Sequence, residues 1–407
     1  MISFNQARQI ILENVSATGT EQVSLLDAAG RVLAANAVAP WDMPLCDNSA
    51  MDGYAVRAAD CADLPCRLKV SGFLPAGGKA VALNVEAGTA IRIMTGAPAP
   101  TGYDAVVPVE ETDNGDQEVT LLKQVQKGQH FRLRGEDVKA GETFIKSGAI
   151  IRPPEINMMA NFGMALLPVY RRPTVAILST GDELVELGTT PGPGEIINSN
   201  ILSLAAAVRE VGGIPMIIGI ARDNRKSHEE KLKQGAKADV LITSAGVSAG
   251  DCDLVRDVLA EMGAQQIFWK VAVKPGGPTA FSLLGTTPIF SLPGNPVSTM
   301  ITFEEFVRPA LLRMQGHSRV FRPLFKAVLR ENERKKPGKV QIVRIRLEKE
   351  GDKWYAASAG NQQTAILKTM LEANALALLP AESTIFNAGD EVDVHFYGNY
   401  IELAERA

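Results

Sequence analysis

The sequence of 407 residues has few of the residues that build disulfide frameworks and zinc sites. It contains four cysteines, none of them in a CxxC pair, and four scattered histidines. So few thiols in so long a chain are typical of a reducing compartment, where cysteines are mostly structural. We therefore expect reduced thiols and no zinc, and we disfavour a histidine-based hydrolase.

Long apolar runs and an excess of positive charge are also missing. The longest apolar stretch, residues 214–221, is far shorter than the roughly 20 residues that span a bilayer. The N-terminus has no small-residue cleavage site and has the pattern of an amphipathic helix rather than a signal peptide. A net charge of −4 and a pI of 5.8 argue against a nucleic-acid partner. We expect a cytoplasmic protein that binds neither membrane nor nucleic acid.

Three common catalytic motifs are absent. Gly78-Lys79 is followed by Ala80, and Phe73 stands where a P-loop would have its first glycine. The sequence contains no GxSxG elbow and no HExxH helix. Phosphoryl-type chemistry, carried out by electrostatics and a metal ion, remains open.

The residues that are present predict a folded chain of several domains. Hydrophobic residues make up 46% and charged residues 22%, and a prior of about 150 residues per domain gives two to four domains. In residues 172–316, short apolar runs alternate with amphipathic helical stretches, which predicts a doubly wound α/β domain with a parallel sheet. The predicted strands are 174–178, 214–220, 239–243, 267–271 and 288–291, and helices are predicted at 199–211 and 251–262.

The flanking regions have different patterns. Residues 41–140 are rich in glycine and proline and predict a mostly β domain, in which stretches 104–109 and 118–125 are joined through a turn at 113–116. Residues 1–40 and 141–171 form a small helical and extended linking domain in this interpretation. Turn residues after Gly316 predict hairpins and a small β-barrel or sandwich over 317–407. The overall prediction is a multidomain α/β plus β protein.

Polar or glycine-rich loops follow every predicted strand of the α/β domain. Because ligands of doubly wound sheets bind outside the carboxyl ends of the strands, we expect a site where these loops meet. The loops are Ser179-Thr180-Gly181-Asp182-Glu183, Arg222-Asp223, then 244–251, 274–278 and 292–298.

Carboxylates in these loops are candidate ligands for Mg²⁺, which typically uses one or two carboxylates plus substrate phosphates. The candidates are Asp182, Glu183, Asp223, Asp251 and Asp253. Simpler interpretations stay open: Asp251 could only cap a helix, 244–250 could be a tight turn, and Lys274 could be a surface charge.

Five blocks of sequence strongly resemble the molybdopterin molybdotransferases, the family that includes the bacterial MoeA proteins and the gephyrin E domain. The resemblance covers essentially the whole chain. The blocks are 48–56 (Asn-Ser-Ala-Met-Asp-Gly-Tyr-Ala-Val), 91–98 (Ile-Arg-Ile-Met-Thr-Gly-Ala-Pro), 134–137 (Arg-Gly-Glu-Asp), 179–184 (Ser-Thr-Gly-Asp-Glu-Leu) and 292–298 (Leu-Pro-Gly-Asn-Pro-Val-Ser).

The resemblance implies a MogA-like α/β domain and a homodimer whose active sites are shared between subunits. It also implies which residues form the site. The implied catalytic residues are Asp52, Asp137, Glu183, Asp223 and Asp253, of which Asp52, Glu183, Asp223 and Asp253 are candidate metal ligands. The implied substrate-binding residues are Thr95, Ser244, Gly246, Ser248, Lys270, Lys274, Arg344 and Thr364, together with Pro293 and Pro296 of the family's proposed molybdate pocket.

Two positions depart from the family pattern. Ala245 stands where the family usually has a glycine, and it would be strained if that position needs a positive φ. Gly277 stands where a second lysine usually follows the Lys-Pro-Gly turn, so one cation is lost.

The resemblance implies an enzyme that inserts molybdate into adenylylated molybdopterin with Mg²⁺ and releases AMP. A molybdopterin adenylyltransferase is an alternative enzyme, and it would also be a possible partner that supplies the adenylate. A gephyrin-like scaffold is an alternative of another class. The extra β domains argue against the first alternative, and the intact acidic loops argue against a purely structural role.

Overall fold

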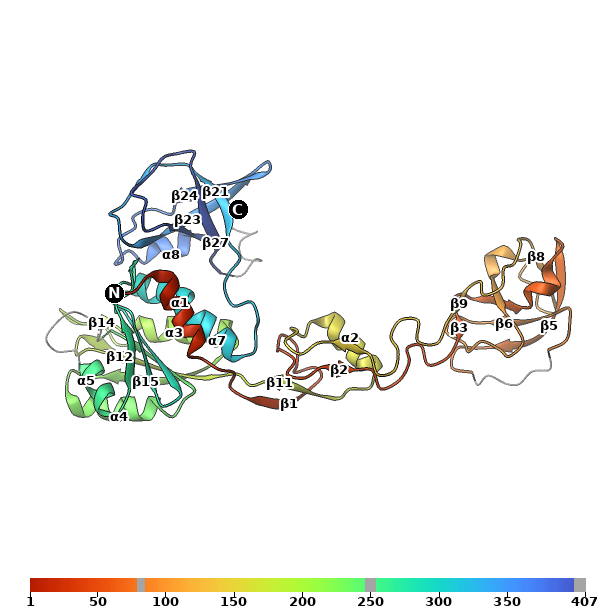
Figure 1. Cartoon of the computed structure of the whole chain (residues 1–407), viewed down its shortest axis with the longest axis horizontal. Coiled ribbons are helices and arrows are strands. Elements are labelled where there is room, and N and C mark those ends of the chain that lie inside the picture. The colour runs from red at the N-terminus through yellow and green to blue at the C-terminus, as the bar shows by residue number, and fades with distance from the viewer. Residues whose placement is uncertain (79–84, 246–253, 399–407) are drawn as a thin grey trace. The chain divides into compact units, whose positions relative to one another are not determined.

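The computed structural model describes residues 1–78, 85–245 and 254–398 (Figure 1). The chain forms two compact units. The first contains Met1–Val23, Gly30–Ala34 and the chain from Pro168 onward, and the second contains Ser24–Ala29 and Ala35–Leu167. Among the described residues, no helix is long and apolar enough to cross a membrane. The division into four domains stays a prediction.

A mixed sheet with the strand order β15-β12-β16-β20-β19-β17 is the framework of the first unit. β12, β15, β16 and β20 are parallel, and β19 runs antiparallel to both of its neighbours. The prediction of a doubly wound α/β domain is confirmed, but β19 was missed. Only Gly285 and Thr286 separate β19 from β20, so these strands form a hairpin. The strands are β12 (Thr174–Thr180), β15 (Ile214–Ala221), β16 (Val240–Ser244), β17 (Gln265–Trp269), β19 (Ala280–Leu284) and β20 (Thr287–Leu292).

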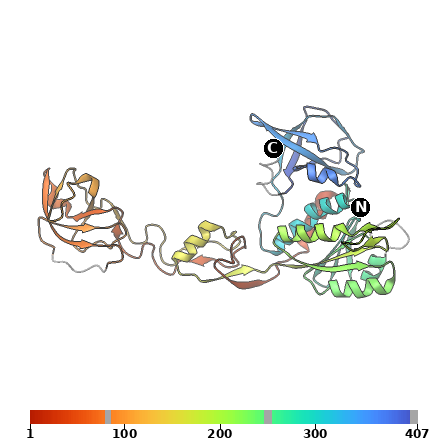
Figure 2. The same cartoon turned by 180° about the vertical axis from the view of Figure 1, so that it is seen from behind.

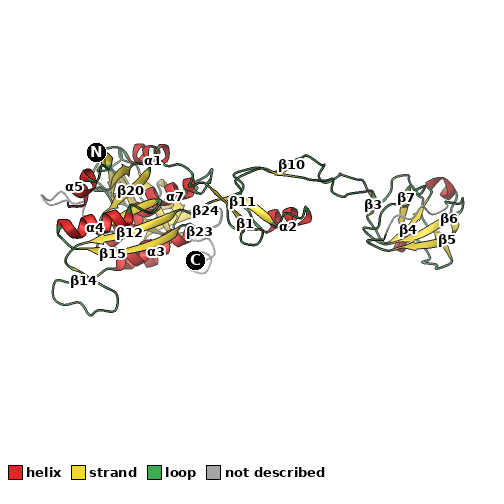
Figure 3. Cartoon of the chain, turned by 90° about the horizontal axis from the view of Figure 1, so that it is seen from below, coloured by secondary structure: helices red, strands yellow, loops and turns green. Residues whose placement is uncertain are grey.

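Helices cover both faces of this sheet (Figure 3). Alternate residues of β12 enter different cores: Val175 and Ile177 pack with α3 and the α6–α7 region, whereas Ala176 and Leu178 pack with α4 and α5. Burial on both faces explains the nearly continuous apolar strand sequences. The helices are α3 (Ser199–Glu210), α4 (Arg225–Gly235), α5 (Leu254–Glu261), α6 (Pro296–Thr302), the π-helical η3 (Phe303–Val307) and α7 (Arg308–Met314).

Helix α1 (Phe4–Glu13) belongs to the α/β core. Ser3 and Gln6 form a capping box at its start, and Phe4, Ala7 and Ile11 are buried against the same cluster as α3 and α7. The sequence interpretation grouped this segment with residues 141–171. Its apolar stripe shows that a helix must be buried, but not against which partner.

The C-terminal strands, blue in Figures 1 and 2, close into a barrel in the order β23-β24-β21-β27-β25, with β25 pairing back to β23. This confirms the predicted barrel-like domain. The Gly351-Asp352 turn joins β23 to β24, and β18 extends the sheet from β23. The elements are β18 (Val273–Lys274), β21 (Phe325–Leu329), β22 (Glu333–Arg334), β23 (Val340–Glu350), β24 (Lys353–Ser358), α8 (Lys368–Glu372), β25 (Ala375–Leu379), β26 (Ile385–Phe386) and β27 (Glu391–Phe396).

The second unit contains a sheet with the order β7-β4-β6-β5-β8, so the mostly β prediction is confirmed. The stretches 104–109 and 118–125 contain β7 and β8, which lie at opposite edges of this sheet. Around the predicted turn at 113–116, Thr112 forms an antiparallel bridge with Leu121. The strands are β4 (Gly53–Val56), β5 (Cys66–Leu74), β6 (Thr89–Ile93), β7 (Ala105–Pro108) and β8 (Glu118–Leu121), with short helices η1 (Ala58–Cys61) and η2 (Val109–Glu111).

Helix α2 (Pro153–Asn161) begins at Pro153-Pro154, where proline is well suited to the first turn, and is followed by Gly163 at φ +65°. Short two-stranded pairings complete the described chain: β2 (Ala37–Val38) with β10 (Thr143–Ile145), β3 (Asn48–Ser49) with β9 (Phe131–Arg132), and β1 (Thr20–Ser24) with β11 (Leu166–Tyr170).

Candidate functional site

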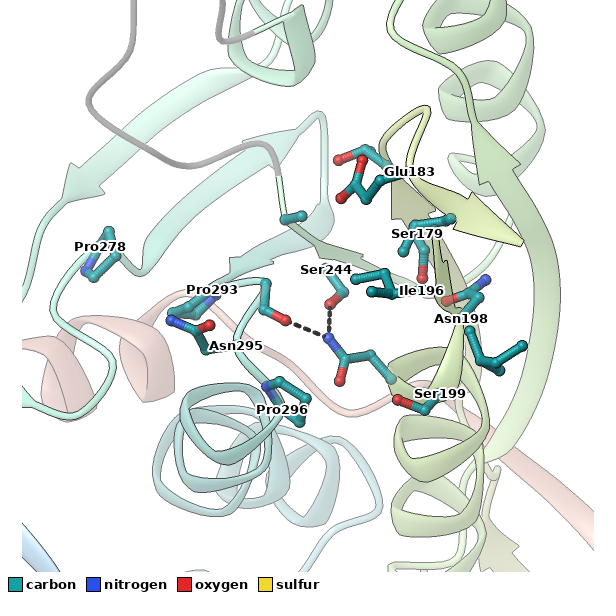
Figure 4. A pocket seen from close by; sticks show the side chains of 16 residues that line it. Ser179, Glu183, Ile196, Asn198, Ser199, Ser244, Pro278, Pro293, Asn295 and Pro296 are labelled. Carbon is teal, nitrogen blue, oxygen red and sulfur yellow. Dashed lines mark hydrogen bonds between the residues drawn. The ribbon is translucent and has the colours of Figure 1, made fainter. Parts of the chain in front are cut away.

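A pocket of about 430 Å³ lies at the carboxyl ends of β12, β16 and β20 (Figure 4). Its wall also includes the parallel pair β13 (Leu184–Val185) and β14 (Ile196–Ile197) and the start of α3. This is the edge at which the sequence predicted a ligand site. Four predicted site residues line the pocket: Glu183, Ser244, Pro293 and Pro296.

The loop after β12 holds the acidic side chains. Gly181 has φ +139°, and a Cβ atom there would lie 2.2 Å from Oε2 of Glu183. A glycine is therefore required for the Glu183 carboxylate to fold back over this turn. The backbone N–H of Asp182 donates to Oδ2 of Asp223 (3.2 Å), and the N–H of Asp223 donates to Oδ1 of Asp182 (3.1 Å). These two bonds tie the loops after β12 and β15 together.

Arg222 holds the acidic loop in place through hydrogen bonds to its backbone. Its Nη1 donates to the carbonyl oxygens of Gly181 (3.4 Å), Asp182 (3.1 Å) and Leu184 (2.9 Å). A guanidinium is suited to this task because its donors are held in a rigid fork. Sequence reasoning noted Arg222 only as part of a loop.

Asn200 connects three parts of the pocket. Its Nδ2 donates to Oγ of Ser244 (2.9 Å) and to the carbonyl oxygen of Gly294 (2.7 Å), as the dashed lines in Figure 4 show. Ser179, Asn198 and Asn200 all line the pocket, and none of them was a candidate from the sequence. The sequence placed residues 199 and 200 at the start of a predicted helix, 199–211, and the β13–β14 pairing leads the chain to the strand ends just before them.

The two departures from the family pattern have visible consequences. Ala245 has φ +76°, a conformation that L-residues other than glycine rarely adopt. The expected strain is therefore present at this position. At Gly277, a Cβ atom would lie 3.8 Å from Nζ of Lys339, so another lysine reaches the place where the side chain is missing.

The predicted cationic residues lie outside the pocket lining. Lys274 is exposed in β18, and Nζ of Lys270 lies 3.8 Å from the ring centroid of Trp269. Neither is among the residues that line the pocket.

Arg344 is fully buried in β23. Its Nε donates to Oγ1 of Thr369 (2.7 Å), and its Nη2 donates to the carbonyl oxygens of Asn361 (3.1 Å) and Gln363 (3.3 Å). Nη1 has no hydrogen-bond partner among the described residues. Burial lowers the pKa of Arg344 and is the one cause of its shift, with no carboxylate contributing among those residues. Thr364 is partly buried next to Gln363, but the hydroxyl that contacts Arg344 belongs to Thr369.

The remaining predicted residues belong to the second unit. Oδ1 of Asp52 accepts hydrogen bonds from the backbone N–H (2.6 Å) and the hydroxyl (2.7 Å) of Thr95, and these bonds hold the pKa of Asp52 below its usual value. Next to Asp52, Gly53 must be a glycine, because a Cβ atom would lie 2.0 Å from the carbonyl oxygen of Val107. Asp137 is exposed, and its N–H donates to the carbonyl oxygen of Met43.

Predicted residues Gly246, Ser248, Asp251 and Asp253 lie outside the described residues. In the described part of the chain, no group of three or more His, Cys, Asp or Glu side chains is arranged to hold a metal ion.

Comparison with known families matches three successive regions. The MoeA N-terminal region (domain I and II) matches residues 2–163, a "probable molybdopterin binding domain" matches 176–313, and the MoeA C-terminal region (domain IV) matches 326–397. The α/β unit with a pocket at its strand ends is therefore of the molybdopterin-binding class, placed within a multidomain chain.

Full-length relatives define the family more closely. Molybdopterin molybdenumtransferase 2 of Mycobacterium tuberculosis is 39% identical over 97% of this chain and 99% of its own, and the Haemophilus influenzae molybdopterin molybdenumtransferase is 34% identical over 98% and 100%. A crystal structure of the molybdopterin biosynthesis moeA protein from Pyrococcus horikosii covers 98% of this chain and 100% of its own with a TM-score of 0.85 at 28% identity. The chain belongs to the molybdopterin molybdenumtransferase family, as the sequence blocks predicted.

Proposed function

We propose that this protein is a transferase of molybdenum cofactor biosynthesis that inserts molybdate into adenylylated molybdopterin and releases AMP. The observation that carries the proposal is the match over nearly the whole length to relatives named for this transfer. The pocket at the strand ends, lined by Glu183, Ser244, Pro293 and Pro296, supports it. The adenylyltransferase alternative is not favoured, because the match includes all three family regions. The scaffold alternative is not favoured, because the full-length relatives are named as transferases.

Mg²⁺ fits the donor set at this edge. The carboxylates of Glu183 and Asp223 are hard oxygen ligands on neighbouring loops that are tied together by hydrogen bonds. Mg²⁺ needs only one or two protein carboxylates when substrate phosphates complete its shell, so a closed group of protein ligands is not required. We propose Glu183 and Asp223 as ligands, with Asp52 and Asp253 as further candidates. When bound, the ion would stabilise negative charge on the phosphate oxygens.

Other residues would bind the anionic parts of the substrates. A buried guanidinium without a carboxylate is a strong site for an oxyanion, because charge-assisted hydrogen bonds are strong and the charge is otherwise uncompensated. We propose that Arg344 binds molybdate through its free Nη1, with Thr364 nearby. Lys270 and Lys274 would neutralise phosphate charge, and Ser244, Gly246 and Ser248 would contact phosphate oxygens.

We further propose a cytoplasmic homodimer in which Asp52, Thr95 and Asp137 of one subunit complete the site of the other. The family resemblance supports this proposal, and these residues and Glu183 belong to different compact units of the chain. A molybdopterin adenylyltransferase would be the partner that delivers the substrate.

The deciding experiment is incubation of the full-length chain with adenylylated molybdopterin, Mg²⁺ and molybdate. We expect AMP release and a product that activates an apo-molybdoenzyme, both of which depend on Mg²⁺ and molybdate. The control replaces molybdate with sulfate, which should yield no active cofactor. A folded sample that releases no AMP would contradict the proposed transfer, and formation of adenylate from ATP would favour the alternative enzyme.

A further inference from the structure

Lys270 has a backbone conformation that L-residues rarely adopt. Its φ is +68°, directly after Trp269, the last residue of β17. This conformation is fixed on both sides, because the Lys270 N–H donates to the carbonyl oxygen of Thr279 (3.1 Å) and its carbonyl oxygen accepts from the N–H of Ile2 (3.1 Å). Strained backbone of this kind concentrates at functional sites, where the surrounding contacts maintain it. The left-handed turn at Lys270 therefore requires an explanation.

The left-handed turn brings the Lys270 side chain over its own neighbour. Successive side chains of a strand point to opposite faces of the sheet, so a lysine that continued β17 would point away from Trp269. Instead, Nζ of Lys270 lies 3.8 Å from the centroid of the Trp269 ring. Indole is the aromatic side chain that attracts a cation most strongly. The strained turn thus forms a cation–π pair between consecutive residues.

Trp269 is itself held in place by the sheet and by α5. It pairs in register with Ala280 of β19, and Cζ of Arg256, on α5, lies 5.4 Å from the centroid of its ring. Within the described residues, the Lys270 ammonium forms no ion pair and donates no hydrogen bond. The ammonium is therefore held by an aromatic face and keeps its charge for an anionic ligand.

The pair lies at the edge of the sheet where the pocket lies. β17 runs in the same direction as β20, because both are antiparallel to β19, so Trp269 ends its strand at the carboxyl edge. Thr279, which accepts the Lys270 N–H, follows Pro278, and Pro278 lines the pocket (Figure 4). The described lining residues include no Lys or Arg, and Glu183 among them is acidic. An anionic group at this edge therefore depends on cations beside the pocket, such as Lys270.

We propose that Trp269 is a positioning residue: its indole face and the left-handed turn hold the Lys270 ammonium at the carboxyl edge of the sheet for a phosphate group of the substrate. The inference rests on the proposed function for the identity of that substrate. A lysine side chain loses conformational entropy when it is fixed, and a side chain that is fixed beforehand loses less on binding. Removing the indole should therefore weaken substrate binding more than the turnover of bound substrate.

The first test measures the rate at which acetic anhydride acetylates the Lys270 amine, by peptide mass spectrometry of the full-length chain. The indole covers one side of the amine, so Trp269→Leu should raise this rate about threefold. Trp269→Phe keeps an aromatic face and should stay near the wild-type rate. Acetylation of Lys353, an exposed lysine of β24, is the internal reference.

The second test measures AMP release at varied concentrations of adenylylated molybdopterin. Trp269→Leu should raise KM about three- to tenfold, which corresponds to about 0.6–1.4 kcal/mol of binding free energy, while kcat stays within about twofold of the wild type. Trp269→Phe should recover most of this loss. In a Lys270→Ala background, Trp269→Leu should raise KM no further, because the cation that it positions is already absent.

Tyr355→Leu is the matched control. Tyr355 is a partly buried aromatic residue of β24, and Cζ of Arg330 lies 4.6 Å from the centroid of its ring. It forms the same kind of pair on the barrel. The control should leave both the acetylation of Lys270 and KM unchanged. If Trp269→Leu does not fold, Trp269→Met, whose long side chain fills more of the space without an aromatic face, takes its place.

The proposal is overturned if Trp269→Leu and the wild type acetylate at the same rate at Lys270, if Trp269→Phe behaves like Trp269→Leu, or if the KM effect persists in the Lys270→Ala background. The two tests also separate this inference from the proposed function. Faster acetylation of Lys270 in Trp269→Leu, without AMP release by the wild type, would reject the transferase function and retain the positioning role. Unchanged acetylation with normal AMP release would do the reverse.

Discussion

At the scale of single residues, Ala245 offers a direct test of backbone strain. Its φ of +76° costs an L-residue about 1–2 kcal/mol, and the greater chain entropy of glycine offsets about half of this. We expect Ala245→Gly to raise the free energy of unfolding by about 0.5–1 kcal/mol. Ala207→Gly, in the middle of α3, should lower it by about 1 kcal/mol. Urea unfolding followed by fluorescence measures the free energy of unfolding of both variants. Changes of the same sign in both variants would show that Ala245 is not strained.

Arg222 is predicted to act through the loop that it holds. Arg222 donates three hydrogen bonds to the 181–184 backbone. Without these bonds, Glu183 would lose its fixed position. We expect Arg222→Gln to raise the Mg²⁺ concentration for half-maximal AMP release about tenfold, which corresponds to a loss of about 1.4 kcal/mol of Mg²⁺ binding free energy. The rate of AMP release at saturating Mg²⁺ should fall less. Arg225→Gln is the control, because Arg225 begins α4 and pairs with Glu229 and Glu261. Equal Mg²⁺ dependence of both variants would rule out the positioning role.

Single residues also show how far sequence reasoning reaches. Glu183 was predicted because it follows a strand, and the ends of parallel strands meet by topology. Ser244, Pro293 and Pro296 were named as site residues by the family resemblance, and their loops also follow predicted strands. Asn198 and Asn200 were not predicted, because they lie outside these motifs, and the short pair of β13 with β14 brings the chain before them back to the same edge. Thr369 was missed for a related reason: α8 brings it to Arg344, and no spacing in the sequence reveals that contact.

At the scale of secondary structure elements, Asp239 links the starts of β12 and β16. It accepts hydrogen bonds from Arg171 (2.6 and 2.9 Å) and from Thr174 (2.7 Å). Burial alone would raise the pKa of Asp239, but the bonds from Arg171 and Thr174 outweigh it and lower the pKa from 3.8 to about 2. A carboxyl with a lowered pKa stabilises the fold above its unfolded pKa, and this contribution is lost as the pH falls through the folded value.

We therefore expect Asp239→Asn to cost about 1–2 kcal/mol at pH 7, after allowance for solvent screening of this partly exposed pair. The difference from wild type should shrink between pH 4 and pH 2. Unfolding free energies of both proteins at pH 7, 4, 3 and 2 measure this difference. Asp257→Asn, which changes a carboxyl on α5, controls for net charge. A difference that stays constant down to pH 2 would contradict the linkage.

The pairing of elements was predicted well only where connections are regular. Alternation of apolar runs and helices identified the α/β domain, because a crossover helix forces neighbouring strands to be parallel. In the second unit, the turn residues at 113–116 do lie within a local antiparallel bridge between Thr112 and Leu121, yet β8 pairs along its length with β5, which comes much earlier in the chain. Turn chemistry identifies a reversal of the chain but does not specify the strand partner.

At the scale of the whole molecule, the proposed function requires Asp52 and Glu183 to act in one site. They belong to different compact units of the chain, and the proposed homodimer would unite Asp52 of one subunit with Glu183 of the other. Both side chains are exposed, so removing either one leaves the core intact. Asp52→Ala and Glu183→Ala should each give a folded homodimer with little AMP release.

When these two inactive variants are unfolded and refolded together, about half of the dimers should be mixed by random assortment. In a mixed dimer with shared sites, one site has both carboxylates and the other has neither. The pool should therefore recover about a quarter of wild-type activity if the sites act independently. If each site were built within one chain, every site in every dimer would lack one carboxylate and no activity would return. Mass spectrometry of the refolded pool must confirm the mixed dimers, and their presence without recovered AMP release would reject shared sites while leaving the transfer reaction intact.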